Sequence, residues 1–288
     1  MTADALAIDG LTKRFDGFVL DGVSLALAPG RVMGFVGQNG AGKTTTIRLV
    51  LNMAARDGGE VTVLGLDNVA DELAVKQEIG VVLDELPLVD TWKVRDVARA
   101  LAPLYDRWDT RTHQDLLARF DLPADRTVKG LSRGMRLKLM LAVALSHDAR
   151  LLILDEPTSG LDPVARDELL DVLREYVADG RRSVFFSTHI TSDLEKIADD
   201  VTLIHRGRVF FSGGTDELLD GFVVVTSDAD APSDDLREHL VGLTTERHGF
   251  SGLLPVAHAG LAGEGTTTER PTIDDVLVYV AKEDRRHG

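Results

Sequence analysis

Runs of apolar residues that end at glycine or at charged residues recur along the chain and predict the strands of a buried sheet. Arg31 to Val36 ends at Gly37, and Leu151 to Leu154 ends at two acidic residues. Ile79 to Leu83 and Val184 to Phe186 have the same character. Strands that are apolar at nearly every position are typical of parallel sheets covered on both faces. The pattern therefore predicts an α/β fold.

Helical spacing separates these runs. Thr44 to Asn52 predicts a helix after the first run, and Gly58-Gly59 is expected to end that unit. Leu161 to Ala178 carries an apolar stripe along one face, as an amphipathic helix does. From about residue 85 to 150 the spacing is helical and punctuated by prolines, which predicts a helical insertion. A hairpin is expected around Arg206-Gly207.

The composition changes after about Gly221, and residues 222–288 are predicted to form a small accessory domain that follows an ATPase domain at 4–220. This stretch contains 12 acidic and six basic residues. Its segment from Gly260 to Thr268 is rich in glycine and threonine, which favours a loop. Thr272 is expected to start a final helix, with Asp275 completing a capping box.

Charge and composition exclude several classes of function. The formal net charge of −15 argues against a nucleic-acid partner, which calls for a basic face. The chain has no cysteine, so disulfides and thiol nucleophiles are excluded. No run approaches the roughly 20 apolar residues that span a bilayer, and no signal-peptide pattern is visible at the start. We expect a membrane role, if any, to be peripheral.

A phosphate-binding loop follows the first apolar run. The eight residues that fit G-x-x-x-x-G-K-[ST] are Gly37, Gln38, Asn39, Gly40, Ala41, Gly42, Lys43 and Thr44. Glycines let successive backbone N–H groups turn toward phosphate oxygens, and the helix that follows adds its positive dipole end. Lys43 is expected to reach the β- and γ-phosphates of ATP, and the hydroxyl of Thr44 to ligate Mg²⁺. Thr45, directly after this loop, is also predicted to bind the nucleotide.

Acidic and imidazole side chains follow two further apolar runs. Asp155 and Glu156 come directly after Leu151 to Leu154, and His189 follows Val184 to Phe186. The carboxyl ends of parallel strands meet at the ligand crevice of such a sheet. Asp155 is therefore expected beside Mg²⁺ and Glu156 beside the attacking water, as a general base worth roughly 10²–10⁴-fold in rate. His189 is the candidate to contact the γ-phosphate and Glu156.

Three short segments carry a family resemblance. Leu131 to Met135, with sequence LSRGM, resembles the signature motif of ABC ATPases, and Ser159 to Asp162 resembles their D-loop. Thr188-His189 resembles the H-loop. The motifs stand in family order, and the resemblance covers roughly residues 4–215.

The resemblance implies a P-loop NTPase (RecA-like) core with an antiparallel β subdomain, a helical insertion subdomain and a small C-terminal α+β appendage. It also implies that two subunits face head to tail. The hydroxyl of Ser132 and the N–H of Gly134 would then contact the γ-phosphate of the partner's ATP, and Asp162 would communicate across the interface. Phe15 matches the aromatic position that stacks on adenine, with Phe18 as a nearby alternative.

Two departures from the family pattern stand out. Asp84 occupies the position of the Q-loop glutamine, so the sensing of γ-phosphate or the coupling to a membrane partner is expected to differ. The signature segment carries Arg133 and Met135 in place of Gly and Gln, which adds a positive charge near phosphate and removes a polar contact.

The chain most resembles bacterial subunits of the acetoin-operon and antibiotic-exporter type, which serve separate membrane subunits. The implied partners are a second ATP-binding subunit and an integral membrane permease, with the chain peripheral on the cytoplasmic side of the cell membrane. Two alternatives are a soluble ABC ATPase of DNA repair or ribosomes and a non-hydrolysing regulatory binder. The 89 residues between Lys43 and Ser132 leave no room for the coiled-coil insertion of the first, and Glu156 and His189 argue against the second.

Overall fold

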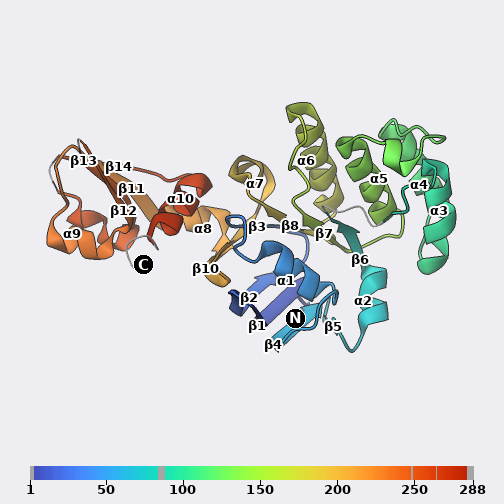
Figure 1. Cartoon of the computed structure of the whole chain (residues 1–288), viewed down its shortest axis with the longest axis horizontal. Coiled ribbons are helices and arrows are strands. Elements are labelled where there is room, and N and C mark those ends of the chain that lie inside the picture. The colour runs from blue at the N-terminus through green and yellow to red at the C-terminus, as the bar shows by residue number, and fades with distance from the viewer. Residues whose placement is uncertain (1–2, 84–87, 248, 264, 284–288) are drawn as a thin grey trace.

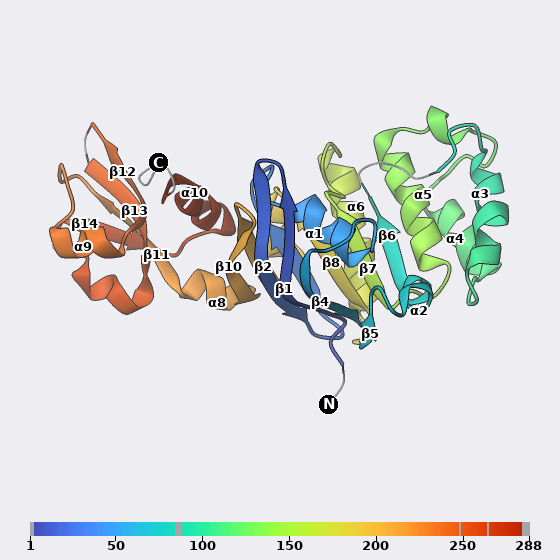
Figure 2. The ribbon, with the colours of Figure 1, turned by 60° about the horizontal axis from the view of Figure 1, so that its bottom comes forward.

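The computed structural model describes residues 3–83, 88–247, 249–263 and 265–283. The described residues form three sheets, two of which lie side by side in the middle of the molecule (Figure 1). The helical insertion lies at one end of this axis and the C-terminal sheet at the other, and both views agree on this (Figure 2). The predicted P-loop, acidic pair and histidine follow strands of the central sheet between them. The fold is the α/β arrangement that the sequence predicts.

The central sheet has six strands in the order β10-β9-β3-β8-β7-β6. Neighbouring strands from β9 to β6 are parallel, and β10 pairs antiparallel with β9. The strands are β3 (Val32–Val36), β6 (Ile79–Val82), β7 (Leu151–Asp155), β8 (Ser183–Thr188), β9 (Asp200–His205) and β10 (Arg208–Gly214). The four predicted buried strands and the predicted hairpin are confirmed.

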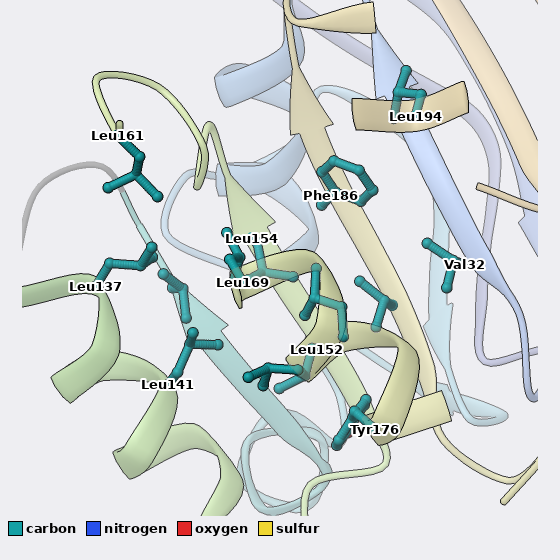
Figure 3. Packing of buried hydrophobic residues seen from close by; sticks show 14 of the residues in the cluster. Val32, Leu137, Leu141, Leu152, Leu154, Leu161, Leu169, Tyr176, Phe186 and Leu194 are labelled. Atoms are coloured by element: carbon teal, nitrogen blue, oxygen red, sulfur yellow. The ribbon is translucent and has the colours of Figure 1, made fainter. Parts of the chain in front are cut away.

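The central strands are buried on both faces, which explains why they read as continuous apolar runs. In β7, Leu152 and Leu154 belong to one hydrophobic cluster, whereas Leu151 and Ile153 belong to the other. Figure 3 shows the first cluster, in which side chains of α5 (Arg133–Leu145) and α6 (Pro163–Val177) gather over β7 and β8. The labelled members from these helices are Leu137, Leu141, Leu169 and Tyr176. Replacing one such leucine by alanine costs about 2–5 kcal/mol of stability.

A four-stranded antiparallel sheet packs beside the P-loop. Its order is β2-β1-β4-β5, and its strands are β1 (Leu6–Phe15), β2 (Phe18–Leu27), β4 (Gly58–Val63) and β5 (Leu66–Asp67). The expectation that Gly58-Gly59 ends a unit is wrong, because these glycines begin β4, whose Gly58 pairs with Thr12 of β1. The predicted first helix is α1 (Lys43–Val50), and it is followed on the chain by β4.

The turn at Arg206-Gly207 joins this sheet to the P-loop. The N–H of Gly207 donates to the carbonyl of Ala41 at 2.9 Å, and its own carbonyl accepts from the N–H of Asp21 at 2.8 Å. Gly207 has a φ of 78°, and a Cβ there would lie 1.9 Å from the carbonyl oxygen of Val19. Only glycine allows this close backbone approach.

The predicted helical insertion contains α3 (Val94–Leu101), α4 (Thr110–Arg119) and α5, after α2 (Glu72–Glu78). Two histidines of this insertion are buried, and one of them contacts β6. Nε2 of His147 lies 3.0 Å from the carbonyl oxygen of Ile79, and Nδ1 of His113 lies 3.1 Å from Oγ of Ser146. Burial lowers the pKa of both histidines.

The chain continues through α7 (Thr191–Ile197) and α8 (Thr215–Asp220) into a C-terminal antiparallel sheet of order β12-β13-β11-β14. These strands are β11 (Phe222–Ser227), β12 (Val241–Glu246), β13 (Gly249–Pro255) and β14 (Thr266–Glu269), accompanied by α9 (Asp234–His239) and α10 (Ile273–Glu283). The predicted capping box of α10 is confirmed: the N–H of Thr272 donates to Oδ2 of Asp275 at 2.9 Å, and the N–H of Asp275 donates to Oγ1 of Thr272 at 3.1 Å. The N–H of Ile273 donates to Oε1 of Glu195 on α7 at 3.1 Å.

Candidate functional site

The ends of three adjacent strands bring the predicted site residues to one edge of the central sheet. In the register of the sheet, Val36 at the end of β3 pairs with Thr188, and Asp155 at the end of β7 pairs with Ser187. Because β8 lies between β3 and β7, the P-loop, the acidic pair and His189 all leave the sheet at the same level. This is the crevice where open α/β sheets bind ligands.

Three glycines of the P-loop have backbone angles or close contacts that a residue with a Cβ atom would not tolerate. Gly40 and Gly42 have φ angles of 81° and 114°, in the region that glycine alone populates freely. A Cβ at Gly37 would lie 2.3 Å from the carbonyl oxygen of Ile204. These three positions therefore have to be glycine for the loop to wrap between β3 and α1.

Lys43, Glu156 and His189 form a connected group of polar side chains. Nζ of Lys43 lies 3.2 Å from Oε1 of Glu156, and Nδ1 of His189 lies 2.7 Å from Oε2 of the same carboxylate. Lys43 is 6% exposed and also donates to the carbonyl of Gly37 at 2.7 Å. Lys43, which the sequence assigned to the phosphates alone, thus shares the Glu156 carboxylate with His189. A buried charge of this kind is retained where its partners hydrogen-bond it.

Ser187 anchors the two acidic residues from the neighbouring strand. Its hydroxyl donates to Oδ1 of Asp155 at 2.6 Å and accepts from the N–H of Glu156 at 3.1 Å. Ser187 is fully buried and Asp155 is 5% exposed. Glu156 itself has a φ of 51°, a conformation that costs a non-glycine residue roughly 1–3 kcal/mol and clusters at functional sites.

A cavity of about 680 Å³ opens over this group. It has room for the phosphates and sugar of a nucleotide, since small-molecule sites span about 300–1,000 Å³. Its lining comes from the P-loop, the first hairpin and the ends of β7 and β8: Gly17, Phe18, Asn39, Gly40, Gly42, Lys43, Thr44, Thr45, Glu156, Ser159 and His189. Most of the predicted P-loop binding residues are therefore brought together with Glu156 and His189. Ala41 is buried at 5% exposure and lines a neighbouring cavity with Asn39 and Gly40.

The lining favours a different aromatic residue from the one first expected to stack on adenine. Phe18 lines the cavity, whereas Phe15 is 48% exposed and its ring centroid lies 6.5 Å from that of Phe18. Phe15 and Phe18 pair across the tip of the β1–β2 hairpin. The hairpin therefore presents two rings near the loop, and the stacking role of Phe15 stays a prediction.

The lining of the P-loop cavity does not include Asp155, which lines a second cavity that has Glu156 in common with the first. This cavity measures about 380 Å³ and is shared by Asp155 and Glu156 with Arg133 and Arg136 of α5. Asp155 and Thr44 offer the carboxylate and hydroxyl oxygens that Mg²⁺ prefers, so their chemistry fits the predicted metal. No group of three or more His, Cys, Asp or Glu side chains with metal-ligand spacing occurs among the described residues.

The predicted signature and D-loop residues cap helices. Oγ of Ser132 accepts from the N–H of Met135 at 3.2 Å as the N-cap of α5. Oδ1 of Asp162 accepts from the N–H groups of Val164 and Ala165, both at 3.0 Å, as the N-cap of α6. The described lining of the P-loop cavity includes no residue of the signature segment, and Gly134 lines a crevice between α5 and α6 instead. Asp84, the predicted Q-loop residue, lies outside the described residues.

Ser159 and Ser187 belong to the site but were not assigned roles from the sequence. Ser159 comes from the segment that was assigned only to the D-loop, and it lines the cavity. Ser187 stands directly before Thr188 and His189. A polar residue at the end of a buried strand was the sequence feature that could have indicated its role. Its bonding depends on the register of β8 against β7, which a single sequence does not specify.

In the part of the chain that the structure describes, every helix is too short or too polar to cross a lipid bilayer.

Comparisons with known proteins agree with this geometry. The family described as ABC transporter matches residues 20–159. The chain is 34% identical to the daunorubicin resistance ATP-binding protein DrrA3 of Streptomyces coeruleorubidus over 99% of this chain and 98% of that protein. It is 35% identical to the ABC transporter ATP-binding protein NatA of Bacillus subtilis over 69% of this chain and 82% of that protein.

Two further comparisons agree. A Nod factor export ATP-binding protein I from Rhizobium meliloti is 36% identical over 75% of this chain and 66% of that protein. A solved structure of an ATP-binding subunit of an ABC transporter superimposes with a TM-score of 0.69 at 25% identity, covering 75% of this chain and 92% of that chain.

Proposed function

The chain belongs to the ABC transporter family as an ATP-binding subunit, and from this premise we propose that Glu156 and His189 carry out ATP hydrolysis in a head-to-tail dimer that drives a separate membrane permease. ATP hydrolysis coupled to transport is its enzymatic activity. The observation that carries the residue assignment is the shared carboxylate, since Glu156 contacts both Lys43 and His189.

The roles of the residues follow from their positions. Lys43 and the backbone N–H groups of the P-loop bind and orient the phosphates of ATP. Glu156 positions the attacking water and accepts its proton, while His189 holds the Glu156 carboxylate at 2.7 Å. Thr44 and Asp155 would hold Mg²⁺, which would supply positive charge against the phosphate oxygens of ATP.

The remaining parts of the proposal concern partners. Ser132 and Gly134 at the start of α5, and Asp162 at the start of α6, act on the ATP held by the partner subunit, because the P-loop cavity of the same chain is lined by other described residues. We propose that residues 4–220 form the ATPase domain and residues 222–288 an accessory domain. Export is the proposed direction, because relatives of the chain are a drug-resistance and a Nod factor export protein. The subunit would then lie on the cytoplasmic side of the membrane, against the permease.

The experiment that tests the proposal replaces Glu156. Glu156→Gln keeps the size and hydrogen-bonding capacity of the side chain but removes its basicity, so turnover is expected to fall at least 100-fold. ATP binding is expected to be retained, together with an ATP-dependent dimer in size-exclusion chromatography. The matched control is Glu60→Gln on the exposed side of β4, which is expected to leave turnover unchanged. Hydrolysis at the normal rate by Glu156→Gln would remove the assignment of the base.

A second variant tests the phosphate contact. Lys43→Ala removes the one buried cation that lines the cavity among the described residues, and ATP affinity is expected to fall at least tenfold. Equilibrium binding of a fluorescent ATP analogue measures this directly, and an unchanged dissociation constant would contradict the role given to the P-loop.

A further inference from the structure

An ion pair between a partly exposed arginine and a buried aspartate joins the first turns of α6 and α7, and none of the steps above uses it. Nη1 of Arg166 on α6 lies 3.9 Å from Oδ1 of Asp193 on α7, and Asp193 is 1% exposed. Neither carboxylate oxygen of Asp193 has a hydrogen-bond partner among the described residues, and neither does Nε of Arg166. A buried carboxylate without hydrogen bonds is costly, so stability alone does not explain this pair.

The pair lies one helical turn beyond two functional residues. The N–H of Arg166 donates to the carbonyl of Asp162, the N-cap of α6 that follows the D-loop, at 3.0 Å. The N–H of Asp193 donates to the carbonyl of Ile190, the residue after His189, at 3.2 Å. The contact therefore links the turn that starts at the D-loop with the turn that starts at the catalytic histidine.

The neighbouring contacts make α7 unable to shift freely. Leu194, next to Asp193, packs closely against Gly34 of β3. A Cβ added to Gly34 would lie only 2.3 Å from Cδ2 of Leu194. Leu194 is fully buried. Because α7 is held against β3 on this side, the attraction between Asp193 and Arg166 acts on how the first turn of α7 lies against α6.

We propose that Arg166 and Asp193 are positioning residues for ATP hydrolysis, which fix the D-loop and His189 relative to each other. The inference rests on the proposed function, in which His189 acts on the chain's own ATP and Asp162 on the partner's. The pair acts through His189 and Asp162 and touches no substrate itself.

The length of the carboxylate side chain provides a specific test. At 3.9 Å the ions attract but do not form a hydrogen bond, which needs about 2.7–3.2 Å between nitrogen and oxygen. Asp193→Glu adds one methylene, about 1.5 Å of chain, and brings the carboxylate within hydrogen-bonding reach of Arg166. Asp193→Asn keeps the shape of the side chain and removes the charge.

The experiment compares steady-state ATP hydrolysis by four full-length chains: wild type, Asp193→Asn, Asp193→Glu and Asp167→Asn. Asp167→Asn is the matched control, because it breaks the exposed ion pair of Lys196 and Asp167 between the same two helices, at 2.7 Å. We expect Asp193→Asn to lower kcat about tenfold while the KM and the dissociation constant for ATP stay within about twofold. Asp193→Glu is expected to keep at least the wild-type kcat, and Asp167→Asn to stay within about twofold.

Several results would overturn the inference. The inference is wrong if Asp193→Asn keeps the wild-type kcat. It is also wrong if Asp193→Glu hydrolyses ATP as slowly as Asp193→Asn. A loss of kcat accompanied by an equal loss of ATP affinity would show that the pair is merely structural. If Asp193→Asn does not fold, a tenfold loss of kcat in Asp193→Glu refutes the inference by itself. Failure of the proposed function is separate, because it shows as absent turnover in the wild type or as retained turnover in Glu156→Gln.

Discussion

Removing one hydroxyl group at the end of β8 tests how the acidic pair is held in place. Ser187→Ala deletes the hydrogen bond to the carboxylate of Asp155 at 2.6 Å and the acceptor for the N–H of Glu156 at 3.1 Å. The N–H of Glu156 keeps a second acceptor, the carbonyl of Ser187, also at 3.1 Å. The main loss is therefore one bond to a charged group, worth about 1.5–3 kcal/mol.

The same change is expected to slow hydrolysis. Without the hydroxyl, the Asp155 carboxylate is free to turn, and the strained backbone of Glu156 loses one of the contacts that support its φ of 51°. A displacement of these groups that raises the activation free energy by about 1.4 kcal/mol lowers kcat tenfold. We therefore expect Ser187→Ala to lower kcat at least tenfold in steady-state ATP hydrolysis and to lower the unfolding free energy in urea by about 2 kcal/mol.

Ser183, at the other end of the same strand, is the matched control. It is also fully buried, and its hydroxyl accepts from the N–H of Gly30 at 2.9 Å and donates to the carbonyl of Ala28 at 3.4 Å. Ser183→Ala loses neutral hydrogen bonds, costs about 0.5–1.5 kcal/mol and leaves kcat unchanged. The reasoning fails if both serine variants slow hydrolysis equally, or if Ser187→Ala unfolds at the wild-type urea concentration.

Three further predictions concern the two hairpin phenylalanines, the two buried histidines and the buried Tyr176. Phe18→Ala is expected to weaken ATP binding at least fivefold and Phe15→Ala less than twofold, because Phe18 lines the cavity; calorimetry that gives the reverse order would return the stacking role to Phe15. The unfolding free energy is expected to decrease as the pH falls below about 6.5, because burial lowers the pKa of His113 and His147 and the unfolded chain then binds protons first. A urea midpoint that stays constant between about pH 7.5 and 5.5 would contradict this. Tyr176→Phe removes the buried hydrogen bond to the carbonyl of Ala149 at 2.6 Å and is expected to lower the unfolding free energy by about 1–2 kcal/mol, with ATP affinity unchanged as its internal control.

The strands of the central sheet were predictable because burial on both faces leaves a local mark in the sequence. Leu151 to Leu154 is apolar at every position, and the same holds for Val184 to Phe186. The strand β4 left no such mark, since Gly58 and Gly59 resemble a turn and only alternate residues after them are apolar. Its pairing with β1 is a tertiary contact, and tertiary contacts override local preference.

The site was predictable in its residue types and in the pairing of His189 with Glu156, but not in the contact of Glu156 with Lys43. A lysine in a P-loop, a glutamate after a strand and a histidine after the next strand each have a local signature. That Glu156 also contacts Lys43 depends on the order of β3, β8 and β7 in the sheet. Short helices such as α7, with seven residues, span two turns and are too brief to show a helical repeat in a single sequence.

The turn at Gly207 has a consequence for how the two ends of a nucleotide are spaced. One residue, Gly207, hydrogen-bonds both the carbonyl of Ala41 in the P-loop and the N–H of Asp21 in β2, and β2 begins with Phe18. A methyl group at position 207 would occupy the space of the Val19 carbonyl and act as a wedge between the two sheets. Gly207 therefore helps to fix the distance between the phosphate end of the pocket and its aromatic end, although it belongs to none of the nucleotide-binding motifs.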